Sequence, residues 1–201
     1  MSAEWLSEDE MTAWVRLAAV MELLPGVLDG QLRRDANLTQ FEYYVLAMLS
    51  ETPERTLRMT ELASRTNSTL PRLSHVAKRM AARDLVERFP CPSDGRATNV
   101  RLTELGWTTL EGAAPGHVAQ VRRYVFDTLT AEQVAQLAGV AGALLTRLDP
   151  DGSVTPEAAG LSLASTDADL HMSAGWLGPI GMSQSIKRNS AAAAAAADNP
   201  P

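Results

Sequence analysis

Hydrophobic and polar residues along residues 67–106 follow a helical period first and then two short extended runs. The polar residues that recur every three or four positions, and so share one helix face, are Ser68, Arg72, His75, Arg79 and Arg83. The apolar residues on the opposite face, which we expect to be buried, are Leu70, Leu73, Ala77 and Met80. The pattern predicts a helix with a packed back and a basic, hydrogen-bonding front.

The segment after this helix predicts a β-hairpin. Residues 84–89 and 98–102 form the extended runs, and the turn-rich residues 90–96 separate them. Asp94-Gly95 between such runs is a hairpin signal, with Gly95 expected at the positive φ that these turns require. A basic helix followed by a hairpin with an arginine at its tip suggests a winged helix-turn-helix.

A long helix with a broad apolar face is predicted for residues 7–35. Ser7 starts it, and acidic residues fill its first turn, where the helix dipole favours them. Pro25-Gly26 is expected to kink or interrupt this helix, because proline removes a hydrogen bond and clashes with the preceding turn. The apolar face is broader than a surface helix needs, so we expect part of it to contact a second molecule.

Three shorter helices are predicted before the hairpin. Thr39 is expected to cap the first of them, and Thr60 to cap a short helix over residues 61–66. Asn67 or Ser68 is expected to cap the basic helix. Three helices with a short turn before the last match the helix-turn-helix pattern.

Two more helices are predicted after the hairpin. Thr103 caps the first, which is expected to be kinked or broken at residues 112–116. Thr130 starts the second with a capping box, and the apolar residues in heptad register along it are Val134, Leu137, Ala141, Leu144 and Leu148. Residues 151–201 are rich in Ala, Ser, Gly and Pro and predict a flexible low-complexity tail.

The charge is unevenly distributed along the chain. The net charge is −6, but residues 53–103 hold ten Lys/Arg against five Asp/Glu, a net +5, and the remainder holds eight against nineteen, a net −11. A basic segment in an acidic protein is expected when one surface meets phosphates. A basic, solvated helix face is the alternative interpretation.

Several classes of protein are disfavoured by the residues present. The three histidines lie far apart with no partner at metal-ligand spacing, and no glycine-rich phosphate loop or nucleophile motif occurs. We therefore expect no enzyme, metal or cofactor. One cysteine, an acidic N-terminus unlike a signal peptide, and no apolar run near the ~20 residues of a membrane span favour a cytoplasmic protein.

The order of elements resembles the multiple-antibiotic-resistance regulator (MarR) family of bacterial transcription factors over roughly residues 10–149. The most specific part is the hairpin and the helix after it. The matching residues are Leu38-Thr39-Gln40-Phe41, Leu46, Leu49, Leu62-Ala63, Ser68-Thr69, Leu73, Asp94-Gly95-Arg96, Val100-Arg101-Leu102-Thr103 and Gly106. The chain departs from the family pattern at Pro25-Gly26 and Pro115-Gly116.

The resemblance implies a mainly α fold with a small β-hairpin wing. It implies an N-terminal dimerisation helix (1–36), a winged helix-turn-helix DNA-binding domain (37–103), C-terminal dimerisation helices (104–150) and the tail (151–201). It also implies a homodimer on a palindromic operator, with the recognition helix in the major groove and the wing arginine in the minor groove. Many family members release DNA when a small aromatic compound binds, which suggests a ligand-responsive repressor. A helical protein-interaction adaptor that does not bind DNA is the alternative.

These expectations assign DNA-binding roles to the basic helix and the wing. Arg72 and His75 are candidates for base contacts, with phosphate contact or solvent exposure as the alternative. For Arg79 a phosphate contact or an intramolecular salt bridge is favoured, and the same holds for Arg83. The remaining candidates are Ser68 and Thr69, as donors to phosphate or base, and Arg96, in the minor groove. Asp94 is expected to pair with a nearby arginine and stiffen the hairpin.

A small aromatic effector is the other expected partner. The aromatic and apolar residues near the junction of the dimer helices with the DNA-binding domain are Trp14, Met21, Phe41 and Tyr44. They line a ligand pocket in one interpretation and pack in the core in the other. Cys91, in the wing, has no cation beside it in sequence to lower its pKa, and is interpreted as structural or incidental.

Overall fold

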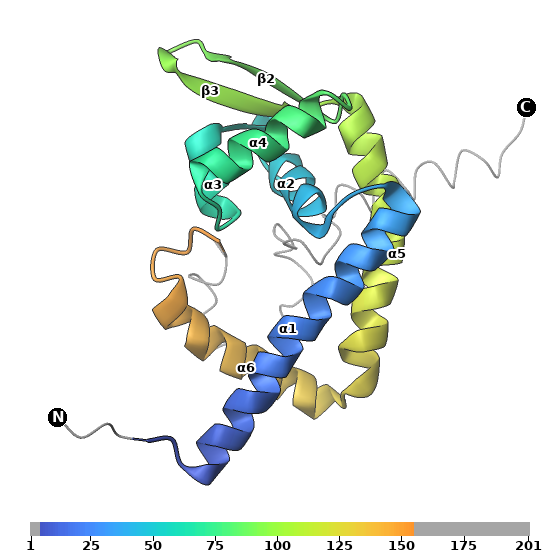
Figure 1. Ribbon diagram of the computed structural model, residues 1–201, viewed down its shortest axis with the longest axis vertical. Coiled ribbons are helices and arrows are strands. Elements are labelled where there is room, and N and C mark those ends of the chain that lie inside the picture. The colour runs from blue at the N-terminus through green and yellow to red at the C-terminus, as the bar shows by residue number, and fades with distance from the viewer. Residues whose placement is uncertain (1–4, 155–201) are drawn as a thin grey trace, which may run out of the picture.

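The computed structural model describes residues 5–154, which form a mainly helical fold with a small antiparallel sheet (Figure 1). The elements, in order, are α1 (Glu8–Ala36), α2 (Gln40–Ser50), η1 (Pro53–Arg55), β1 (Thr56–Arg58), α3 (Met59–Arg65), α4 (Leu70–Ala81), β2 (Val86–Cys91), β3 (Asp94–Leu102), α5 (Glu104–Tyr124), η2 (Phe126–Thr128) and α6 (Ala131–Leu148). The predicted fold class is confirmed. Residues 155–201, the greater part of the predicted tail, lie outside the described residues.

The two long helices, α1 and α5, pack against each other, and α5 leads from the winged domain to α6 (Figure 1). Pro25 lies inside α1 and Pro115 inside α5, and both helices continue through their prolines. Of the two expected outcomes, interruption of the helices is therefore wrong, and a kink at these sites stays a prediction. Each proline removes one helical hydrogen bond, but the packing of α1 along α5 supports both helices on either side of it.

The hydrophobic core is built around α2, which packs against α1, α3, α5 and the sheet. Its fully buried residues are Val45, Leu46, Met48 and Leu49. On α4 the predicted back face is buried at Leu73, Ala77 and Met80, as expected. Leu70 is the exception, with 44% of its surface exposed, and it borders an open cavity between α4 and the wing.

Four helix starts follow the predictions, and the first is Ser7, which forms a capping box with Glu10 at the start of α1. Thr39 and Glu42 form a capping box at the start of α2, and Thr130 starts α6 in the same way. The Gly106 N–H donates to Oγ1 of Thr103 at 2.9 Å at the start of α5. These motifs were predictable because each involves residues only three positions apart.

The predicted starts of α3 and α4 are wrong. Pairing of β1 with β3 fixes the chain as far as Arg58, so α3 begins at Met59 and Thr60 lies inside its first turn. The N–H of Ser68 donates to the carbonyl of Ala63 at 2.9 Å and closes the turn between the helices. Thr69 is then the residue before α4, without a side-chain capping hydrogen bond.

The wing is longer than predicted, and its turn lies within the predicted turn-rich residues 90–96 but not at Asp94-Gly95. Strands β2 and β3 pair from Val86 opposite Leu102 to Cys91 opposite Asp94, so the connection between them is Pro92-Ser93. Gly95 lies within β3, and Gly152 is the only glycine with a positive φ in the described residues, so the turn predicted at Asp94-Gly95 is wrong. β1 adds a third strand, in the order β1-β3-β2.

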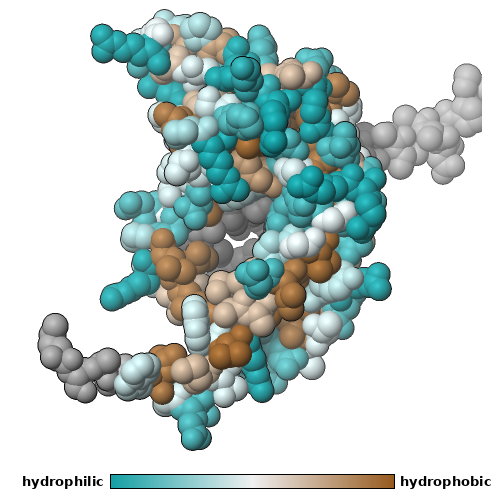
Figure 2. Space-filling model, viewed as in Figure 1, coloured by the Kyte–Doolittle hydropathy of each residue, from teal (hydrophilic) through white to brown (hydrophobic). Residues whose placement is uncertain are grey.

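Large apolar side chains remain exposed at the end of the molecule far from the wing (Figure 2). No residue of α6 is buried, and its exposed apolar residues are Leu137, Val140, Leu144 and Leu148. Those of α1 include Trp14, Val15, Leu17, Val20, Met21 and Leu23. These two faces need a further surface to cover them.

α1 is also long and apolar enough, by length and composition alone, to cross a membrane. The expectation that no stretch approaches such a length considered only uninterrupted apolar runs, and Arg16 and Glu22 interrupt this one. A helix that packs in a protein interior or interface passes the same test. Leu28, Gln31 and Leu32, in the C-terminal half of α1, are buried in this way inside the protein.

Candidate nucleic-acid interface

The outer face of α4 presents the polar stripe predicted from its sequence. Thr69, Arg72, His75 and Arg79 are exposed, and Ser68, in the turn before the helix, is half-buried. Lys78, which the sequence analysis did not single out, is exposed beside them. This face and the wing lie at the same end of the molecule (Figure 1), and the turn before α4 shares a pocket with the C-terminal end of α6, lined by Thr69 and Leu148. The structure therefore brings the predicted DNA-binding groups to one surface.

Arg72 is held by an aromatic ring from α2. Its guanidinium carbon lies 4.7 Å from the centroid of the Phe41 ring. An arginine over an aromatic face is attracted by the ring quadrupole, and the contact restricts the orientations of a long side chain. Phe41, which is half-buried, thus stabilises the position of the Arg72 side chain on α4.

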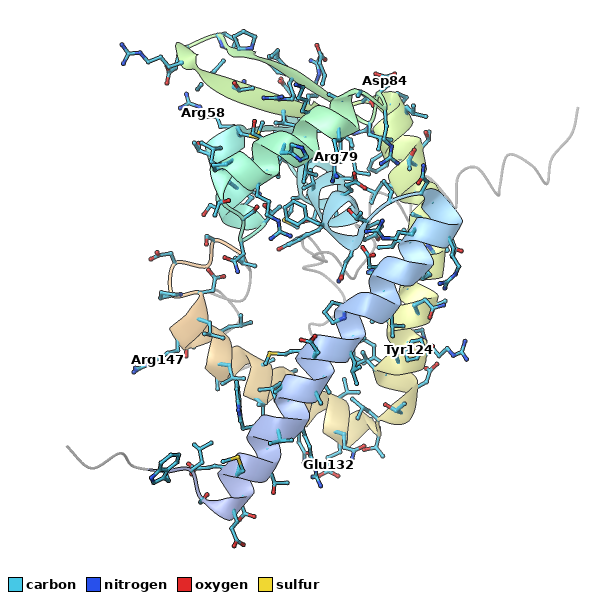
Figure 3. The ribbon with its side chains drawn as sticks, viewed as in Figure 1. Arg58, Arg79, Asp84, Tyr124, Glu132 and Arg147 are labelled. Carbon is cyan, nitrogen blue, oxygen red and sulfur yellow. The ribbon has the colours of Figure 1, made fainter. Side chains whose placement is uncertain are left out.

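Farther along, Arg79 of α4 and Arg83, which follows the end of α4, pair with a buried carboxylate on α2. Oε1 of Glu42 lies 3.4 Å from Nη1 of Arg83 and 3.9 Å from Nη2 of Arg79, which Figure 3 labels. Arg83 also donates to the carbonyl of Asn37. The intramolecular salt bridge that the sequence analysis offered for Arg79 and Arg83 is present. Arg79 remains more than half exposed, so it keeps donors available to a phosphate.

The wing presents Arg96 at its exposed end. Oδ1 of Asp94 accepts the backbone N–H of Arg96 at 3.1 Å. Asp94 therefore stiffens the wing through a backbone hydrogen bond, rather than through the expected pair with an arginine side chain. The Arg96 side chain is exposed and borders a cavity between α4 and the wing.

That cavity has a volume of about 180 Å³. The residues that line it come from α3, α4 and both wing strands, and are Met59, Thr60, Leu70, Ser74, Arg88, Arg96, Ala97 and Thr98. Arg88 was not predicted as a site residue. Its place on β2 depends on strand alternation, which shows which side of the sheet it occupies only once the register is known.

A second, more apolar pocket of about 310 Å³ lies where α1 meets α2 and α5. Its lining residues are Val20, Met21, Leu24, Pro25, Leu28, Gln40 and His117. Of the four predicted ligand-binding residues, Met21 alone is among them. Trp14 is exposed on α1, Phe41 contacts Arg72, and the Tyr44 hydroxyl donates to the carbonyl of Arg65 at 2.9 Å.

His117, another residue that the sequence analysis missed, forms the buried side of this pocket. Its ring centroid lies 4.6 Å from that of Tyr43, and both side chains are almost fully buried. Burial raises the pKa of Tyr43 to about 12. This pair could not be predicted from the sequence, because the packing of α5 on α2 brings the two residues together.

Cys91 is buried beside residues of the wing sheet. Its Sγ lies 3.3 Å from Oγ of Ser93, and this hydrogen bonding lowers the pKa of the thiol, with a smaller contribution from the charge of Arg58. A cation is therefore near the thiol, although none was expected from the adjacent sequence. Pairing of β1 with β3 brings it there. Among residues 5–154, no group of three or more His, Cys, Asp or Glu residues could hold a metal ion.

Comparisons with known proteins agree with this geometry. The model of the MarR family matches residues 36–97. The HTH-type transcriptional regulator YxaD of Bacillus subtilis (strain 168) is 30% identical over 144 residues, which cover 72% of this chain and 91% of YxaD.

Two solved structures from Streptomyces coelicolor are similar over most of the described chain. Sco3205, a MarR family transcriptional regulator in complex with DNA, is 39% identical, with a TM-score of 0.71 and coverage of 77% of this chain and 97% of Sco3205. AbsC, a MarR family transcriptional regulator, is 36% identical, with a TM-score of 0.69 and coverage of 74% and 99%.

Proposed function

This chain belongs to the MarR family of winged helix-turn-helix, DNA-binding transcriptional regulators, and from that premise we propose that it acts in the cytoplasm as a homodimeric, ligand-responsive repressor of a palindromic operator. The observation that carries the proposal is the shared exposure of the α4 stripe and Arg96 at one end of the molecule. A helix of this kind enters the major groove, and a long guanidinium reaches the adjacent minor groove. Sco3205, whose structure contains DNA, supports this assignment.

In-vitro selection of bound DNA from a random pool tests the proposal directly. A recovered palindrome is the expected result, because two identical winged domains read two identical half-sites. Affinity should fall steeply with rising salt, since phosphate contacts release counterions. The chain would instead be an adaptor if no DNA sequence were enriched and if it bound a protein partner with an affinity that salt hardly changes.

Arg96→Ala separates groove contact from a merely structural role of the wing arginine. We expect operator affinity to fall by about 1–3 kcal/mol and the preference for A·T pairs at the flanks to fade. Asp94→Ala, which removes only the backbone hydrogen bond of Asp94, is the matched control. Equal losses in both variants, without any change in flank preference, would contradict the minor-groove role.

The proposed homodimer rests on the uncovered apolar faces of α1 and α6. In a single chain Leu137 and Leu144 are exposed on α6, a helix with no buried residue. A second copy of the chain can cover this apolar face. Leu137→Glu with Leu144→Glu should yield monomer or insoluble protein in sedimentation experiments. Gln136→Glu, an exposed polar position on the same helix, should leave the dimer intact. A stable monomer of the unmodified chain would exclude the proposal.

The proposed ligand response rests on the position of the apolar pocket. Gln40 lines it, and the next two residues, Phe41 and Glu42, contact the arginines of α4. A small aromatic compound in the pocket would displace the first turn of α2 and with it the recognition helix. Such coupling is typically ~1–3 kcal/mol.

A screen of phenolic acids, followed by melting temperature and operator affinity, is the test. Compounds that raise the melting temperature should weaken DNA binding. Leu24→Trp, which fills the pocket, should abolish this response and leave the protein able to bind DNA. A response that survives this substitution would place the effector elsewhere.

A further inference from the structure

We propose that the cavity between α4 and the wing binds one phosphate of the DNA backbone, with Arg88 as its principal ligand. The proposal rests on the proposed function, since it requires that α4 and the wing engage DNA together. The proposal assigns a DNA contact to Arg88, which lies neither on the exposed face of α4 nor at the tip of the wing.

Strand register places Arg88 toward α4. Arg88 lies opposite Val100, which is fully buried, so both side chains are on the face of the sheet that covers the core. The neighbouring residue, Glu87, lies opposite Arg101 and pairs with it on the other face. Arg88 is therefore the basic residue of β2 that borders the cavity.

The guanidinium of Arg88 has donor capacity that the described residues do not use. Its Nη2 donates to Oγ of Ser74 across a long 3.4 Å contact. Its Nε is buried and has no hydrogen-bond partner within residues 5–154. A guanidinium carries five N–H donors, and a buried donor without an acceptor is unfavourable. An anion with several oxygens satisfies such a group best, because arginine binds phosphate with two parallel hydrogen bonds.

The rest of the cavity suits a phosphodiester. Thr60 from α3, Ser74 from α4 and Thr98 from β3 bring hydroxyl groups to its wall, and Arg96 adds a second positive charge. No Asp or Glu is among the residues that line it. Its volume of about 180 Å³ corresponds to about six water molecules in the liquid, which is enough for one phosphate group.

The geometry of DNA places a backbone phosphate beside this cavity when α4 and the wing occupy adjacent grooves. When a helix occupies the major groove and a hairpin reaches the adjacent minor groove, the sugar–phosphate strand that separates the two grooves must pass between them. The cavity lies between α4 and the wing, which are those two elements. Arg88 would then fix the register of the protein along the backbone, so that α4 and Arg96 reach their grooves together.

Single methylphosphonate substitutions along the selected operator provide the test, because each removes the charge of one phosphate. In the unmodified protein, the sensitive phosphates of each half-site should include one held by Arg88, at which affinity falls roughly ten- to hundredfold. Arg88→Gln should weaken binding to the unmodified operator by a similar factor, should lower the salt slope by about one, and should no longer respond to that substitution. Arg101→Gln, which removes a charge from the opposite face of the sheet, should keep full sensitivity at that phosphate.

Two outcomes overturn the proposal. One is an Arg88→Gln variant that stays sensitive at every phosphate to which the unmodified protein responds. The other outcome needs no variant to fold. At least one sensitive phosphate must lie between the base pairs that guanine-methylation interference locates in the major groove and the adjacent minor groove. If no sensitive phosphate lies in that interval, the cavity does not bind the backbone. Failure of the selection to recover DNA would overturn the proposed function instead.

Discussion

Replacing Glu42 tests whether the first turn of α2 holds the recognition helix in place. The Glu42 side chain is 5% exposed, and its Oε2 accepts the N–H of Thr39 at 2.9 Å. Its Oε1 faces Arg83 and Arg79, whose side chains are 34% and 55% exposed. One carboxylate therefore caps α2 and anchors the C-terminal half of α4.

The magnitude follows from these contacts. Loss of the capping interaction costs about 0.5–2 kcal/mol. Removing one partner from a fully buried ion pair costs about 3–5 kcal/mol, but water reaches both arginines here, so about 1 kcal/mol for the pairs together is appropriate. We expect Glu42→Ala to lower the free energy of unfolding by about 2–3 kcal/mol. Glu42→Gln keeps an acceptor for the Thr39 amide and should lower it by about 1 kcal/mol.

Urea denaturation at a fixed protein concentration measures the effect as a shift in midpoint at constant m. Glu61→Ala is the matched control, because Glu61 pairs with Arg65 at 2.7 Å on the same domain but is 47% exposed. That change should cost less than about 0.5 kcal/mol. Equal destabilisation by Glu42→Ala and Glu61→Ala would refute the reasoning, since burial would then have no influence on the pair.

Two further predictions concern packing and pH. Gly106→Ala should lower the free energy of unfolding by at least about 2 kcal/mol in thermal melts, because a Cβ there would lie 2.0 Å from the carbonyl oxygen of Leu85. Gly112→Ala, which meets nothing within 4 Å, should instead raise it by about 0.5–1 kcal/mol. Tyr43, whose pKa burial raises to about 12, should contribute stability that is complete below pH 10 and is lost as pH rises to 12, because only the unfolded chain ionises in that window. The loss should reach about 2–3 kcal/mol, and Tyr43→Phe should abolish it, as alkaline denaturation can show.

The features that the sequence predicted correctly are local ones. The capping boxes at Thr39 and Thr130 each involve four consecutive residues, and the basic face of α4 repeats within a single helix. Such patterns depend on helical period alone, so they need no knowledge of the rest of the chain. The order of the elements, and with it the family, could be predicted for the same reason.

The features that could not be predicted depend on contacts between distant segments. The start of α3 follows from the pairing of β1 with β3, about 40 residues later in the sequence. The continuity of α1 through Pro25 depends on its packing against α5. Arg88 and His117 became candidates only when the strand register and the packing of α5 were known.

The continuity of α1 through Pro25 has a chemical consequence for the apolar pocket. Proline has no N–H, so the carbonyl of Met21, four residues earlier, cannot receive its usual helical hydrogen bond. Met21 and Pro25 both line the pocket, so an acceptor without its helical donor belongs to a wall that is otherwise mainly apolar. A purely hydrocarbon compound would leave that oxygen without a partner, at a cost of about 1–3 kcal/mol. For the effector that we propose, a flat ring with one hydroxyl or amide donor would therefore suit this wall better than a hydrocarbon.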